Sequence, residues 1–226
     1  WTAGQIFSAL RSAQIWEMFE QEFADDSRLV KVLATQSANL SITSARFSAL
    51  NDPAINPAYN MPDALAVAPY FGQVYTPADI PPAAPSYPTL DDILDVDAPA
   101  MIATAWADVV AQKAVADTQG ARLVCYEGGQ HFVGSLGAEN DLTLTGILQA
   151  VNRDPRMYQR YLEYLDLLHD AGVSMFGNFS YVGDWTKWGS WGVLEDQAQP
   201  VVDAQKYQAL VDWSPSVPRL AIVPSR

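Results

Sequence analysis

Few cysteines, few histidines and few charges exclude several classes of protein for this 226-residue chain. Cys125 is the only cysteine, so neither a disulfide framework nor a cysteine-based metal cluster can form. Its place in an apolar run predicts an inert buried thiol. The two histidines, His131 and His169, lie far apart in the sequence, which does not suggest a metal site. The sequence therefore predicts neither a bound metal nor a cofactor.

Several common site motifs and targeting segments are also absent. The chain contains no GxGxxG, P-loop, HExxH, CxxC or GxSxG pattern. It has no run of eighteen apolar residues and no signal peptide, and it opens at Trp1 rather than Met, which we interpret as processing or cutting. Targeting signals therefore do not identify a compartment, although a secreted or periplasmic location is favoured.

Charged residues are few, and acidic residues outnumber basic ones. Charged residues make up 17% of the chain, and the formal net charge is −13. An acidic protein repels nucleic acid and anionic membranes, so the sequence predicts neither partner and favours a neutral ligand. Hydrophobic residues make up 49%, which is enough for a substantial core in one large domain.

Helix and strand patterns alternate along the chain, with a proline-rich segment at 73–89 that we expect to form one wall of a cleft. A disordered spacer is the alternative for that segment. The predicted strands are Arg28–Gln36, Ala64–Phe71, Leu123–Tyr126 and Val173–Tyr181. The predicted helices are Thr2–Phe23, Ser41–Leu50, Leu90–Gln119, Leu142–Val151, a helix that begins at Asp154-Pro155 and ends at Gly172, and Pro200–Trp213.

This order, one helix followed by four strand–helix units, predicts an α/β fold with a parallel sheet. Three of the four predicted strands end in polar or aromatic groups, as at the carboxyl end of a (β/α)8 barrel. We therefore expect a parallel (β/α) half-barrel of four βα units over residues 1–213, equivalent to the C-terminal half of a TIM barrel. Residues 214–226 contain three prolines and are expected to form an irregular tail.

Glu127 is the leading catalytic candidate. It directly follows the apolar run of the third predicted strand and precedes the pair Gly128-Gly129. A carboxylate at the carboxyl end of a buried strand is costly unless it is paired or takes part in chemistry. The alternative is a carboxylate that only caps or pairs with a loop group.

Three runs carry a resemblance to a known class of enzymes: CYEGGQH, NRDPRMYQRYLEYLDLLHDAG and FGNFSYVGDWTKWGSWGVLE. They resemble the C-terminal half, strands five to eight, of retaining clan-A-like (β/α)8 glycoside hydrolases, in which the nucleophilic Glu ends strand seven. The resemblance covers most of the chain and is weakest at 39–62 and in the proline-rich segment. It implies cleavage of a neutral polysaccharide or oligosaccharide.

The resemblance also implies roles for individual residues. Glu127 would be the nucleophile, and Tyr70 would orient its carboxylate unless it is an ordinary strand-end aromatic. Gln130, His131 and Asn178 would bind substrate, although a lone histidine is more often only packed.

Three tryptophans in the last loop, Trp185, Trp188 and Trp191, would offer flat faces to pyranose rings. Tryptophans are usually part of a core, so we expect one or two of these three to stack on sugar.

The acid/base carboxylate does not match the family pattern. Retaining hydrolysis needs two carboxyl groups about 5 Å apart, and in these enzymes the acid/base Glu ends strand four, usually within an Asn-Glu pair. No such pair precedes the first predicted helix, and Glu139-Asn140 has the reverse order in a loop. The second carboxylate would come from a missing N-terminal half or from a second subunit of a homodimer. The alternative function is a non-catalytic carbohydrate-binding protein derived from a TIM barrel.

Overall fold

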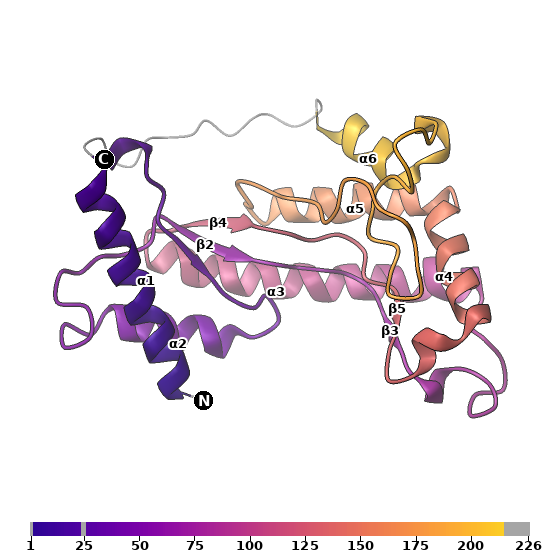
Figure 1. Ribbon diagram of the computed structural model, residues 1–226, viewed down its shortest axis with the longest axis horizontal. Coiled ribbons are helices and arrows are strands. Elements are labelled where there is room, and N and C mark those ends of the chain that lie inside the picture. Colours follow the sequence, from indigo (N-terminus) through magenta and orange to yellow (C-terminus); the bar gives the residue numbers. More distant parts are fainter. Residues whose placement is uncertain (1, 24–25, 215–226) are drawn as a thin grey trace.

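The computed structural model describes residues 2–23 and 26–214, and it combines α-helices with short parallel strands (Figure 1). The strands are β1 (Val32–Ala34), β2 (Ala64–Val67), β3 (Val74–Tyr75), β4 (Arg122–Cys125) and β5 (Val133–Gly134). The α-helices are α1 (Thr2–Glu22), α2 (Leu40–Leu50), α3 (Ala98–Thr118), α4 (Leu142–Arg153), α5 (Arg156–Asp170) and α6 (Gln205–Trp213), and a π-helical stretch, Asp92–Asp97, leads into α3.

The main sheet has the order β1-β2-β4 with both pairs parallel. A further segment, residues 174–177, runs parallel along the free side of β4. It makes one bridge, between Cys125 and Phe176, and the Cys125 amide donates to the Met175 carbonyl at 2.8 Å. The fold is therefore α/β with parallel strands, as predicted.

The two faces of this sheet differ in how they are covered. Leu33, Leu65 and Leu123 stand side by side on one face and are almost fully buried in the main core with α2, α3 and α5. On the other face, Ala66 and Val124 belong to a small cluster separate from that core. The helices thus cover one face of the sheet.

Five helices form a continuous arc, in which α1 contacts α2, α2 contacts α3, α3 contacts α5, and α5 contacts α6. Figure 1 shows α1 and α2 gathered at one end of the strands and α4 and α6 at the other. The amphipathic helix α5 buries Tyr161, Tyr164 and Leu165 against the sheet side of this arc. Gly172 follows α5 with φ +81, which confirms the predicted end of this helix.

The proline-rich segment is ordered by contacts to the rest of the chain. Its β3 pairs in parallel with β5, which the sequence did not predict. The Tyr75 hydroxyl donates to Asp97, and the Tyr87 hydroxyl donates to Asp141, each at 2.9 Å. The two tyrosines therefore anchor this segment, and a disordered spacer is the wrong interpretation.

The first two predicted strands were too long, the third is confirmed with a shift of one residue, and the fourth is absent as a strand. β1 and β2 are confined to three and four residues. Val173–Tyr181 is not a strand, because its first residues bond to β4 whereas Ser180 and Tyr181 bond to residues 191–194 of the tryptophan loop. The sheet has three strands, so a four-unit half-barrel is a proposal for this chain. The predicted tail lies outside the described residues, except Ser214.

Candidate functional site

Glu127 and Tyr70 lie between two backbone contacts that join the segment after β2 to the segment after β4. The Tyr126 amide donates to the Val67 carbonyl at 3.1 Å, and the Phe71 amide donates to the Gly129 carbonyl at 3.0 Å. Tyr70 and Glu127 lie between these two contacts, at the carboxyl ends of β2 and β4. The carboxyl ends of parallel strands meet at one edge of a sheet, so this is the position where α/β proteins place their chemistry.

The Tyr70 hydroxyl lies close enough to the half-buried Glu127 carboxylate for the two groups to interact. Burial raises the pKa of Tyr70, and the negative charge of Glu127 raises it further. The tyrosine therefore stays protonated, with its hydroxyl beside the carboxylate. The orienting role that the resemblance implies for Tyr70 stays a prediction.

Tyr70 also belongs to a closed cycle of four rings, which we call the aromatic quartet: Tyr70, His131, Trp191 and Phe179. Ring centroids are 5.5 Å apart for Tyr70 and His131, and 6.0 Å apart for His131 and Trp191. They are 6.1 Å apart for Trp191 and Phe179, and 6.5 Å apart for Phe179 and Tyr70. The quartet gives the site a rigid apolar wall, and Phe179, which is exposed, was not predicted from the sequence.

His131 is held as a neutral ring within this quartet. Its Nδ1 accepts a hydrogen bond from Trp191 Nε1 at 3.2 Å, and burial lowers its pKa. An accepting Nδ1 places the single proton of the neutral ring on Nε2. His131 thus fixes the orientation of Trp191 and keeps one N–H donor of its own.

The glycine pair after Glu127 permits close packing of the site. Gly129 has φ +129, and a Cβ there would lie 2.9 Å from the Tyr161 hydroxyl and 3.0 Å from Asn178 Oδ1. Only glycine fits such a position without strain. Among the described residues, neither polar atom of the Asn178 side chain has a hydrogen-bond partner, although both are buried.

The Gln130 side chain is buried and bonded within the protein, so it is not open to a ligand. Its side chain is 1% exposed, its Nε2 donates to the Ser190 carbonyl at 2.7 Å, and its Oε1 accepts from the Phe132 amide at 3.0 Å. Both ends of the amide are therefore engaged by backbone groups, and Gln130 ties the tryptophan loop to the Glu127 segment.

The three loop tryptophans lie in three different environments. Trp191 belongs to the quartet beside Tyr70. Trp188 is 60% exposed, with the Lys187 ammonium 4.5 Å from its ring centre. Trp185 lies beneath two cations, with Lys206 Nζ at 4.6 Å and the Arg153 guanidinium at 5.2 Å from its ring centre.

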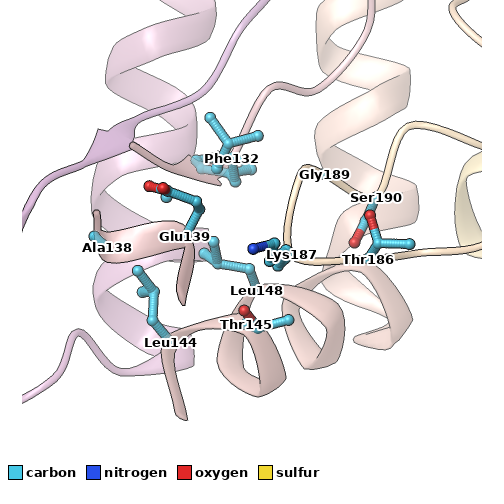
Figure 2. A pocket seen from close by; sticks show the side chains of 12 residues that line it. Phe132, Ala138, Glu139, Leu144, Thr145, Leu148, Thr186, Lys187, Gly189 and Ser190 are labelled. Atoms are coloured by element: carbon cyan, nitrogen blue, oxygen red, sulfur yellow. The ribbon is translucent and has the colours of Figure 1, made fainter. Parts of the chain in front are cut away.

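Two hollows near the loop differ greatly in size. The pocket in Figure 2 lies between Phe132, Leu148 and Lys187 and has a volume of about 10 Å³, room for about one water molecule. A hollow of about 480 Å³, a size that suits a small ligand, is bounded by Asn178, Ser180, Tyr181, Val193, Tyr207, Leu210, Val211 and Ser214.

Comparison of the chain with protein-family models, with curated proteins and with solved structures finds no match. Within residues 2–23 and 26–214, no group of three or more His, Cys, Asp or Glu side chains is arranged to hold a metal ion. None of the helices in the described part of the chain is long and apolar enough to cross a membrane. The site geometry therefore has to carry the functional argument.

Proposed function

We propose that this chain is the nucleophile-bearing part of a retaining glycoside hydrolase that cleaves a neutral polysaccharide or oligosaccharide. The observation that carries the proposal is the Tyr70–Glu127 pair at the carboxyl ends of two parallel strands, next to the aromatic quartet. We further propose that the parallel sheet is half of an eight-stranded barrel.

In this mechanism, a Glu127 carboxylate oxygen attacks the anomeric carbon, and the bond from that carbon to the leaving oxygen breaks. A protonated acid/base carboxyl group gives its proton to the leaving oxygen, and a glycosyl ester with Glu127 forms. The same group then takes a proton from water, which attacks the anomeric carbon and releases Glu127. Tyr70 holds the Glu127 oxygen in position through both steps.

The aromatic quartet supports a neutral sugar as the ligand. Phe179 and Trp191 offer apolar ring surface to the C–H face of a pyranose. The His131 Nε2–H supplies a donor for a hydroxyl group. A net charge of −13 would repel an anionic polymer.

The acid/base group is proposed to come from outside the described residues. The charge of Glu127 raises the pKa of both Tyr70 and Tyr126, and neither tyrosine is an acid at neutral pH. The missing carboxylate would be supplied by another part of a longer protein or by a second subunit.

A carbohydrate-binding protein without catalysis is the second candidate. The observation that favours it is that no Asn-Glu pair at a strand end precedes the first predicted helix. It would use the same rings and the same donors, but it would leave the glycosidic bond intact.

The test uses two variants and one control variant of the polypeptide at its full encoded length. Each is assayed on a panel of neutral oligosaccharides and polysaccharides. Glu127→Gln should abolish hydrolysis while calorimetric titration shows that binding persists. Trp191→Ala should weaken binding by about tenfold, whereas Trp106→Ala, on the outer side of α3, should have no effect. Unchanged hydrolysis by Glu127→Gln excludes this nucleophile, and tight binding without turnover in the wild type supports the binding protein.

A further inference from the structure

The face of the main sheet that the helices leave uncovered is apolar across all its strands. Strand register places Ala34, Ala66 and Val124 side by side, and the pairing of residues 174–177 with β4 adds Met175. Ala34 and Met175, at the two sides of this row, are exposed, Met175 to 58%, whereas Ala66 and Val124 between them are 1% and 7% exposed. We call this row, with the exposed Val32, the open face. Exposed apolar side chains on a sheet face without helices favour contact with another polypeptide.

The open face continues into an unpaired strand edge. β1 is the outermost strand among the described residues, with β2 on one side only. A strand bonds to a given neighbour through alternate residues, so the backbone groups of Val32 and Ala34 point away from β2. Arg46 donates to the Ala34 carbonyl, which confirms that this group is not used within the sheet. An open edge of this kind is a template for another strand.

Helix α1 carries apolar side chains on two faces. Ala9, Ala13 and Trp16 are buried, on the side where α1 packs against α2. A second row at spacings of four residues, which we call the α1 ridge, consists of Phe7, Arg11, Ile15, Phe19 and Phe23, and its four apolar members are exposed. Rows at this spacing are the ridges that pack into the grooves of another helix.

The α1 ridge and the β1 edge are fixed next to each other. Lys31, directly before β1, forms an ion pair with Glu20 of α1 at 3.0 Å, and the Asn60 side chain donates to the Ala13 carbonyl at 3.3 Å. A single partner can therefore bond to the strand edge and pack on the helix ridge at the same time.

We propose that the open face, the β1 edge and the α1 ridge dock a polypeptide of parallel βα units that lies outside residues 1–226 and that is not a second copy of this chain. The inference rests on the half-barrel of the proposed function but not on its chemistry. An eight-stranded barrel has eight strands and eight outer helices. With four strand positions and five arc helices in place, the partner supplies four strands and three helices. Its last strand lies alongside β1, and α1 is the helix that follows this strand.

The arc of five helices argues against a second copy. If two copies joined edge to edge, β1 of one copy would lie beside residues 174–177 of the other. In a barrel, one helix covers this junction. α1 of the first copy would take that place because it precedes β1, and α6 of the second copy would take the same place because it follows residues 174–177. Two helices cannot occupy one place, so closure with a copy requires one of them to leave its packed position.

The test uses thiol labelling, because the native Cys125 is fully buried and unreactive. Met175→Cys reports on the open face and Phe19→Cys on the α1 ridge. Val110→Cys, on the exposed side of α3 in the middle of the arc, is the matched control. Each variant is made in the 226-residue chain and in the polypeptide at its full encoded length, and labelling rates are measured with a maleimide.

We expect rapid labelling at all three positions in the 226-residue chain, at protein concentrations from about 1 to about 200 μM. In the full-length polypeptide, positions 175 and 19 should label about tenfold or more slowly, while position 110 is unchanged. Protection that rises with the concentration of the 226-residue chain would show that a second copy covers the face, which overturns the proposal. Rapid labelling at 175 and 19 in the full-length polypeptide also overturns it, whereas loss of hydrolysis alone affects only the proposed function.

Discussion

The Ser190 carbonyl accepts a hydrogen bond from the Gln130 side chain at 2.7 Å, and this bond joins the tryptophan loop to the segment that carries Glu127. The same carbonyl accepts a hydrogen bond from Lys206 of α6, whose side chain is fully buried. Ser190 is thus the point where the Glu127 segment, the tryptophan loop and α6 meet. The position of Trp191, one residue further on, depends on both donors.

Lys206 should make the stability of the protein depend on pH. Burial lowers the pKa of Lys206 well below its ordinary value, and the charge of Glu195 only partly offsets this effect. Between the lowered pKa and about 10.4, the unfolded chain binds more protons than the folded chain, so the free energy of unfolding rises with pH. Lys206→Met keeps the packing volume and removes the ionisable group, and it should remove a slope of up to about 1.4 kcal/mol per pH unit.

The measurement is a series of urea melts of both proteins from about pH 7 to about pH 10. Other groups titrate in this range too, but they contribute equally to both proteins and cancel in the difference. Equal slopes for the two proteins would show that Lys206 is not a buried amine in solution.

Gly129→Ala should destabilise the fold by on the order of 1–3 kcal/mol or more. The substitution places a methyl group 2.9 Å from the Tyr161 hydroxyl at a backbone φ of +129. The matched control is Gly146→Ala in α4, where the new methyl group meets nothing within 4 Å. It should stabilise the protein by about 0.5–1 kcal/mol. Thermal or urea melts of the two variants would contradict the described geometry if they moved in the same direction.

Local patterns were sufficient to predict the helices but not the extent of the strands. α4 begins at the predicted Leu142, where the Asp141 side chain accepts from the Leu144 amide, and α5 ends before the predicted C′ residue Gly172, because such signals act within one turn. A strand, by contrast, extends only as far as its neighbours do. Val173–Tyr181 has a suitable composition, but β4 reaches only its first few residues, so the rest follows another path.

The candidate site shows the same division between local and distant information. Glu127 and Tyr70 could be predicted because apolar runs ending in polar groups identify the carboxyl ends of parallel strands. The different environments of the three tryptophans could not, because Lys206 and Gln130 set the path of their loop from distant parts of the sequence. Lysines are rarely buried, so the composition of α6 gives no sign that Lys206 is internal.

Tyr70→Phe should slow hydrolysis without weakening substrate binding. The substitution removes the hydroxyl group beside Glu127, which we propose to hydrogen-bond the carboxylate, and keeps the ring that packs on His131 and Phe179. Hydrogen bonds to charged groups contribute about 1.5–3 kcal/mol, so kcat should fall by about ten- to one-hundred-fold while KM changes little. Steady-state kinetics of the full-length polypeptide test this. A rise in KM at constant kcat would mean that Tyr70 binds substrate and does not position the carboxylate.

Trp185→Ala should lower the stability of the protein clearly, whereas Trp188→Ala should leave it almost unchanged. Trp185 packs under Lys206 and Arg153, and its Nε1 donates to the Gly192 carbonyl at 2.9 Å, so its removal leaves a buried amine without its aromatic neighbour. We expect a loss of on the order of 2–3 kcal/mol in the free energy of unfolding. Trp188 is mostly exposed, so Trp188→Ala should change stability by less than about 0.5 kcal/mol. Urea melts of both variants decide between this picture and a loop in which all three tryptophans face ligand, since that loop would tolerate both substitutions equally.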